Sequence, residues 1–166
     1  MKDIILCNGR GQLGSALSNI LPVSKNRESI GIGPNRSYIY HTWNFLNKEQ
    51  SIQQDCYNKF VEFVDQHNKD EIIFISTYSE KDNSYTYYKQ LAESYLLTNI
   101  ELSKIIKLPI IIGNGICRDL KTGKKEPYGL LELISIEDAA KEINVIAQKP
   151  HIQNRVFRVK GEIVLA

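Results

Sequence analysis

A tyrosine and a lysine, Tyr85 and Lys89, stand four positions apart in the stretch SYTYYKQLAE, residues 84–93. On a helix, side chains with this spacing lie on the same face, one turn apart. Such a pair could act as a general acid–base couple, in which the tyrosine moves a proton and the lysine adjusts its pKa. The spacing also fits a tyrosine-rich helix surface, because the chain contains nine tyrosines and 21 lysines and arginines.

A second candidate for chemistry is the stretch NGRGQLGSAL, residues 8–17, in which Gly9, Gly11 and Gly14 fit the pattern G-x-G-x-x-G. An apolar run precedes it, and a helical pattern follows it. In that context the early glycines allow a tight turn and close approach of a pyrophosphate, and the last lets helix and strand pack closely. The helix N-terminus also presents free N–H groups to phosphates. The pattern predicts dinucleotide binding, with a plain turn as the alternative.

Arg10, inside this loop, could reach a phosphate and favour NADP by meeting its 2′-phosphate; a solvent-facing side chain is the alternative. The usual fingerprint also has an acidic residue about 20 residues further on, where it holds the adenosine ribose. Here that zone is the polar stretch 24–37, in which Glu28 is the only acid. The sequence therefore predicts a phosphate-binding turn without a convincing ribose-binding acid.

The elements that must position these residues alternate along the chain. Buried apolar runs indicate strands, and apolar residues at helical intervals indicate helices. In order, we predict strand 3–7, helix 12–21 ended by Pro22, loop 24–37, strand 38–43, helix 51–67, strand 71–76, helix 85–104, strand 108–113, helix 135–148 and a C-terminal strand or hairpin, VFRVKGEIVLA. This alternation predicts an α/β fold: a Rossmann-like, mostly parallel sheet of four or five strands, reduced in strand number, with helices on both faces.

Composition restricts the class of protein. The net charge is +2, from 21 basic and 19 acidic residues. This is not the large excess of basic residues that is typical of proteins that bind nucleic acid or an anionic membrane. The three cysteines and three histidines are scattered, so neither a metal site nor a disulfide framework is expected. No apolar run is long enough for a signal peptide or a membrane span. We expect a cytoplasmic, single-domain protein.

The motifs taken together resemble the short-chain dehydrogenase/reductase superfamily, and more closely its extended, nucleotide-sugar-modifying branch. CNGRGQLGSAL looks like the glycine loop of dTDP-4-dehydrorhamnose reductase-like proteins, although Asn8 replaces the first glycine of G-x-x-G-x-x-G and Gly9 sits one place later. Four further stretches match in the family's order: EIIFISTYS, YTYYKQLAESYLL, LPIIIGNG and ISIEDAAKEI. The second of these carries a typical Lys-x-x-x-Glu continuation from Lys89 to Glu93.

The resemblance implies a role for each candidate catalytic residue. Tyr85 would be the general acid/base for a sugar hydroxyl or carbonyl, and Lys89 would lower the tyrosine pKa from about 10. Lys89 would also hold the nicotinamide ribose, while the cofactor carries the hydride. Thr77 would hydrogen-bond the substrate oxygen, with Ser76 as the alternative occupant of that role.

The implied cofactor is NAD or NADP, with NADP favoured, and the implied substrate is a nucleotide sugar of the kind used in polysaccharide biosynthesis. The residues expected to bind the cofactor are Asn8, Gly9, Arg10, Gly11, Gln12, Leu13, Gly14, Thr42 and Lys89.

The chain is shorter than the family pattern. The family's second and third strands look absent, replaced by the stretch 22–37, and residues 114–134 look like a vestigial C-terminal substrate region within a single truncated domain, 1–166. The exposed edge of the first strand should then be covered by the stretch 22–37 or by a homodimer contact. Three activities stay open: a minimal enzyme, an inactive accessory or regulatory subunit that binds nucleotides, and a nucleotide-sugar activity that needs no complete dinucleotide.

Overall fold

A parallel five-stranded sheet forms the centre of the structure, a computed structural model that describes residues 3–7, 11–21, 36–78, 81–112, 130–151 and 153–165. The sheet order is β1-β2-β3-β4-β7, and every neighbouring pair is parallel. Its strands are β1 (Asp3–Cys7), β2 (Arg36–Tyr40), β3 (Glu71–Thr77), β4 (Ser103–Leu108) and β7 (Arg155–Arg158). The predicted α/β class with a mostly parallel sheet is therefore confirmed.

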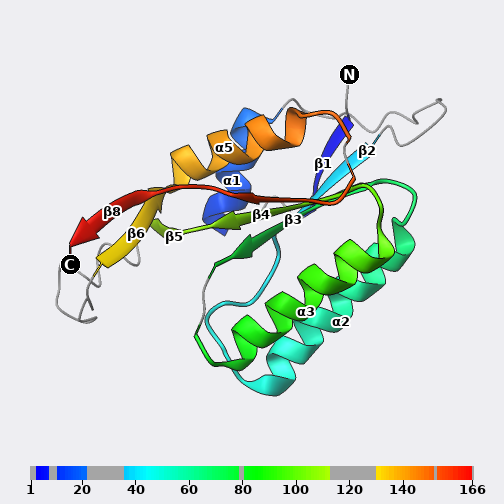
Figure 1. Cartoon of the computed structure of the whole chain (residues 1–166), viewed down its shortest axis with the longest axis horizontal. Coiled ribbons are helices and arrows are strands. Elements are labelled where there is room, and N and C mark those ends of the chain that lie inside the picture. The colour runs from blue at the N-terminus through cyan, green and yellow to red at the C-terminus, as the bar shows by residue number, and fades with distance from the viewer. Residues whose placement is uncertain are drawn as a thin grey trace.

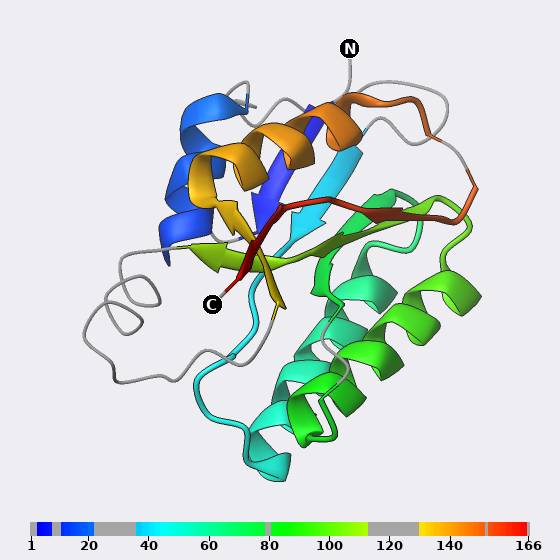
Figure 2. The ribbon, with the colours of Figure 1, turned by 60° about the vertical axis from the view of Figure 1, so that its left-hand side comes forward.

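Two pairs of helices cover the two faces of this sheet (Figures 1 and 2). Helices α1 (Gly11–Ile20) and α5 (Ile136–Gln148) pack together on one face, and α2 (Gln50–Gln66) and α3 (Ser84–Asn99) pack together on the other. Ser135 caps α5, because its side chain accepts the Asp138 N–H as the capping-box pattern predicts. None of the helices that the structure describes is long and apolar enough to cross a membrane.

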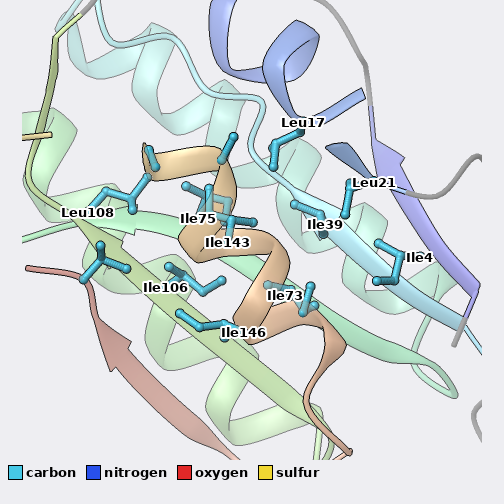
Figure 3. Packing of buried hydrophobic residues seen from close by; sticks show 14 of the residues in the cluster. Ile4, Leu17, Leu21, Ile39, Ile73, Ile75, Ile106, Leu108, Ile143 and Ile146 are labelled. Atoms are coloured by element: carbon cyan, nitrogen blue, oxygen red, sulfur yellow. The ribbon is translucent and has the colours of Figure 1, made fainter. Parts of the chain in front are cut away.

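Alternating residues of the central strands supply both halves of the core. Figure 3 shows the half beneath α1 and α5, where Ile73 and Ile75 of β3 meet Leu17 and Ile143. Ile72 and Phe74 point to the opposite face, into a cluster with residues of α2 and α3. Because β3 is apolar on both faces, it lies in the middle of the sheet, as its unbroken apolar run predicts.

A second, three-stranded sheet continues beyond the carboxyl edge of the first (Figure 1). It contains β5 (Ile110–Ile112), β6 (Leu130–Ser135) and β8 (Glu162–Leu165), in the order β5-β6-β8. Gly161 lies where the chain passes from β7 to this sheet, and a Cβ on it would stand 2.4 Å from the Leu133 carbonyl oxygen. Glycine is therefore required for this close approach.

The structure corrects three predicted elements. The helix predicted over 85–104 ends at Asn99, and the following residues form β4, a strand that the sequence reading missed. Ser103 and Lys104 are polar although they are buried. The sequence pattern therefore did not indicate that a central strand begins there. The strand predicted over 108–113 is β5 of the small sheet, and the C-terminal stretch forms two strands in different sheets, not a hairpin.

Smaller differences concern the ends of elements. The predicted strand 38–43 ends at Tyr40 and begins at Arg36, inside the stretch predicted to be loop. Residues 22–35, including Pro22 and most of that loop, lie outside the described residues, as do residues 113–129. The expected cover of the β1 edge by the stretch 22–37 therefore stays a prediction.

A buried polar cluster lies at the amino end of the sheet. The Glu71 carboxylate accepts a hydrogen bond from Ser37 at 2.8 Å and lies 3.4 Å from the Lys104 ammonium; both Glu71 and Lys104 are fully buried. Lys104 also donates to two backbone carbonyls at the end of α5, at 3.1 and 2.9 Å. His151 Nδ1 lies 2.8 Å from Glu71. The cluster therefore fixes the end of α5 to the central strands.

We expect Lys104→Met to lower the free energy of unfolding by about 3–5 kcal/mol, because it leaves the Glu71 carboxylate buried without the Lys104 ammonium. Urea denaturation followed by circular dichroism measures the change. Lys59→Met is the matched control, since Lys59 forms only an exposed ion pair with Asp55 at 2.9 Å and should change stability by less than about 1 kcal/mol. Equal denaturation midpoints for the two variants would contradict a stabilising role for the buried pair.

Candidate active site

The glycine turn lies at the carboxyl end of β1, where α1 begins at Gly11. Gly11 has a φ of 80°, and a Cβ placed on it would have no atom within 4 Å. The left-handed conformation favours glycine, and no described atom would contact a side-chain carbon at this position. This arrangement can admit a phosphate group. Asn8, Gly9 and Arg10 lie outside the described residues.

The other predicted cofactor residues of this turn differ in exposure. Gln12 is exposed, whereas Leu13 packs against the core and Gly14 is buried, with its carbonyl accepting a hydrogen bond from Ser18 at 2.8 Å. Thr42 lies beyond the end of β2, and its hydroxyl donates to the Cys7 carbonyl at 3.3 Å. Thr42 is thus placed at the same sheet edge as the glycine turn.

Lys89 is enclosed between α3 and the sheet, with a relative exposure of 5%. Its ammonium donates to the Ile75 carbonyl of β3 at 3.0 Å. Three aromatic rings surround the ammonium, with centroids at 4.8 Å (Phe74), 5.0 Å (Trp43) and 5.8 Å (Tyr85). Ring faces attract cations, so this enclosure compensates part of the lost hydration. Tyr85 and Lys89 share one helix face, as their spacing predicts.

Trp43 is held over Lys89 by Gln53, a fully buried residue of α2. The Trp43 indole N–H donates to the Gln53 side-chain oxygen at 2.7 Å. The Gln53 amide nitrogen donates in turn to the carbonyls of Asn44 and Asn47, both at 2.7 Å. These bonds fix the segment between β2 and α2 against the site. Neither Trp43 nor Gln53 was predicted as a site residue, although an aromatic side chain next to Thr42 at a strand end was a signal.

Burial lowers the pKa of Lys89 to about 7, while the Glu93 carboxylate, one turn further along α3, acts in the opposite direction. Cys56 of α2 also acts to raise the pKa of Lys89. Burial raises the pKa of the Glu93 carboxyl group, and Lys107 at 3.2 Å opposes that rise. The Lys-x-x-x-Glu spacing therefore places a second ionisable side chain, that of Glu93, one helical turn from Lys89 along α3.

The expected lowering of the Tyr85 pKa by Lys89 is wrong for this structure. Burial of the Tyr85 phenol raises its pKa to about 12. The Lys89 ammonium is directed at the Ile75 carbonyl and lies beside the Tyr85 ring, so loss of water around the phenolate dominates. The Tyr85 phenol is therefore neutral at neutral pH.

Ser76 and Thr77, at the end of β3, face opposite sides of the sheet because side chains alternate along a strand. Ser76 is buried on the α3 side, where its hydroxyl is close enough to the Glu93 carboxyl group to lower the pKa of that group. Thr77 is half-buried and takes the last position of β3, level with Leu108 of β4. The structure thus brings Ser76, more than Thr77, to the side of Lys89.

The part of the chain that the structure describes contains no group of three or more His, Cys, Asp or Glu side chains that could hold a metal ion. A cavity of about 320 Å³ opens at the start of α3. It is lined by Gln50, Asp82, Asn83, Ser84, Tyr87 and Tyr88, and so contains neither Tyr85 nor Lys89.

No protein-family model and no curated protein matches this chain. Solved structures do match it in fold. A nucleoside-diphosphate-sugar epimerase from Staphylococcus aureus is 14% identical, with a TM-score of 0.72 over 98% of this chain and 72% of that chain. The Bordetella bronchiseptica enzyme WbmG, in complex with NAD and UDP, is 13% identical, with a TM-score of 0.70 over 98% and 74%.

A dTDP-4-dehydrorhamnose reductase from Clostridium acetobutylicum is 15% identical to this chain, with a TM-score of 0.68 over 99% of this chain and 76% of that chain. The expected resemblance is therefore confirmed at the level of fold. The chain has the Rossmann-type fold of nucleotide-sugar epimerases and reductases.

The buried ammonium of Lys89 generates a pH-dependent prediction. An unfolded lysine keeps a pKa near 10.5, whereas the folded value is about 7. Between these values the unfolded chain binds more protons, so Lys89 contributes increasing stability as pH rises. We expect Lys89→Met to raise the free energy of unfolding by up to about 5 kcal/mol at pH 6, with the gain fading toward pH 10.

Chemical denaturation at pH 6, 8 and 10 measures this change. Lys59→Met, at an exposed position of α2, is the control and should show no such trend. A Lys89→Met gain that is equal at all three pH values would contradict a buried, destabilised ammonium.

Proposed function

We propose that the chain is an NAD(P)-dependent oxidoreductase or epimerase that acts on a nucleotide sugar, a shortened relative of the extended short-chain dehydrogenase/reductases. One observation carries the proposal. Tyr85 and Lys89 lie together on α3 at the carboxyl edge of the sheet, where the Gly11 turn also opens. Ligands of open parallel α/β sheets bind at this edge.

The residues present fit the phosphate half of a nicotinamide dinucleotide. No described atom lies within 4 Å of the position that a Cβ on Gly11 would take, and the N–H groups at the start of α1 suit a pyrophosphate. Thr42 lies near the same turn, and Lys89 would hold the nicotinamide ribose. When bound, the cofactor would supply hydride transfer to or from a sugar carbon. WbmG was crystallised with NAD and UDP, which supports this class of cofactor and substrate.

The chain's own residues would then control the proton. Tyr85, neutral because burial raises its pKa to about 12, would donate its phenolic proton to a carbonyl oxygen as that oxygen gains charge. Ser76 or Thr77 would hydrogen-bond the same oxygen. Lys89, with a pKa of about 7, would be partly charged at neutral pH and would favour the phenolate once the proton has left.

A second candidate function is that of a nucleotide-binding accessory subunit without catalysis. The position of Lys89 favours it, because the ammonium is bonded to the Ile75 carbonyl beneath the Trp43 ring. A nicotinamide ribose could reach Lys89 only if this aromatic enclosure opened. The adenosine half of the site is also reduced, since β1 is the outermost of the described strands on its side of the sheet.

Titration of the purified protein with NADH and NADPH tests the proposed function. We expect saturable fluorescence changes with at least one of the two, and a loss of affinity of about tenfold or more for Gly11→Ala, because alanine strains the positive φ of the turn. Gln12→Ala, at the adjacent exposed position of the same turn, is the control and should bind normally. Absence of binding at millimolar concentrations of both cofactors would rule out the dehydrogenase function.

The open edge of β1 generates a prediction about assembly. No described strand pairs with the outer edge of β1, and an unpaired strand edge invites association. We therefore expect a homodimer in sedimentation-velocity experiments at micromolar concentrations. Hydrogen exchange should show protection of β1 amides that is lost on dilution to the monomer. A monomer at all concentrations, with β1 amides that exchange freely, would contradict the dimer.

A further inference from the structure

An arginine at the end of β7 lies flat on an aromatic ring at the carboxyl edge of the sheet. The guanidinium carbon of Arg158 stands 4.0 Å from the centroid of the Tyr78 ring, yet Arg158 is exposed. A guanidinium stacked in this way keeps its N–H edge available for a planar anion. Neither residue belongs to the acid–base group described above.

The Tyr78 ring is held in place from the opposite side. Its hydroxyl donates to the Glu132 carboxylate of β6 and lies 3.3 Å from the Val159 carbonyl. The same carboxylate accepts the backbone N–H of Gly161 at 3.1 Å, and Gly161 cannot be replaced without displacing β6. The platform beneath Arg158 is therefore built from three segments of the chain and is fixed before any ligand binds.

Arg158 has no carboxylate partner among the residues that the structure describes. Glu132 already accepts hydrogen bonds from Tyr78 and Gly161, and it makes no ion pair with Arg158. Lys107, the register partner of Arg158 on β4, is paired with Glu93 at 3.2 Å. Within the described part of the chain, Arg158 thus presents a positive charge that no carboxylate neutralises, stacked on the Tyr78 ring.

The position of this charge separates it from the glycine turn. Tyr78 directly follows Thr77 at the end of β3, and β3 lies two strands from β1 in the sheet. Strands are about 4.8 Å apart, so the β3 end is roughly 10 Å from the β1 end. An oxyanion at Arg158 is therefore a different group from a pyrophosphate at the start of α1, and it lies next to the candidate catalytic hydroxyls.

We infer that Arg158, held on the Tyr78 platform, binds an oxyanion of the substrate, either the diphosphate of a nucleotide sugar or a carboxylate on its sugar. The inference rests on the proposed function for the identity of the substrate. Both groups offer two oxygens in one plane to the guanidinium fork. Arg158 would then orient the sugar against Ser76, Thr77 and Tyr85 and determine which substrates enter.

Calorimetric titration of the full chain with uridine, UDP, UDP-glucose and UDP-glucuronic acid tests the inference, with the matching dTDP ligands in parallel. We expect Arg158→Gln to raise the Kd of the anion-bearing ligand at least tenfold and to leave that of uridine unchanged. Arg158→Lys keeps the charge without the planar fork and should recover only part of the affinity. Arg155→Gln, at an exposed arginine at the start of the same strand, is the matched control and should bind as wild type.

The ligand series separates the two sources of the anion. Equal losses for UDP, UDP-glucose and UDP-glucuronic acid identify the diphosphate, and a loss confined to UDP-glucuronic acid identifies a sugar carboxylate. Wild-type affinities in Arg158→Gln, equal losses in Arg155→Gln, or no binding of any nucleotide would overturn the inference. NADH titration of the same variant decides the proposed function separately, since Arg158→Gln should leave NADH binding unchanged.

Discussion

Burial of β3 on both faces is the constraint on which the rest of the structure depends. Ile73 and Ile75 require the cover that α1 and α5 provide, and Ile72 and Phe74 require α2 and α3. Parallel strands on either side of β3 then end at one edge, together with the turn that opens α1. The candidate catalytic residues lie at this edge because β3, buried between the two layers of helices, ends there.

The same packing explains the state of the acid–base pair. Helix α3 is close enough to the sheet for Lys89 to reach the Ile75 carbonyl, and the segment after β2 places Trp43 over it. Loss of water lowers the pKa of Lys89 and raises that of Tyr85, so both groups favour their neutral forms. A ligand that brought charge or water to this edge would shift both equilibria, which links occupancy of the site to its proton chemistry.

Local patterns in the sequence were sufficient for the α/β class, for α1, α2 and α5, and for the Tyr85–Lys89 helix face, because each depends on periodicity or spacing within one element. They were insufficient for β4, whose buried Lys104 is satisfied by Glu71, more than thirty residues earlier in the chain. They were equally insufficient for the enclosure of Lys89, since Trp43 is positioned by Gln53 of another element. Contacts between distant segments, not local propensity, determine the pKa values of the site.

The structure of the chain crystallised with NADH would test the central claim most directly. The account predicts the pyrophosphate at the start of α1, in front of Gly11, and the Lys89 ammonium released from the Ile75 carbonyl to the nicotinamide ribose, with Trp43 displaced. NADH bound elsewhere, or bound with Lys89 still enclosed beneath Trp43, would contradict a working nicotinamide site.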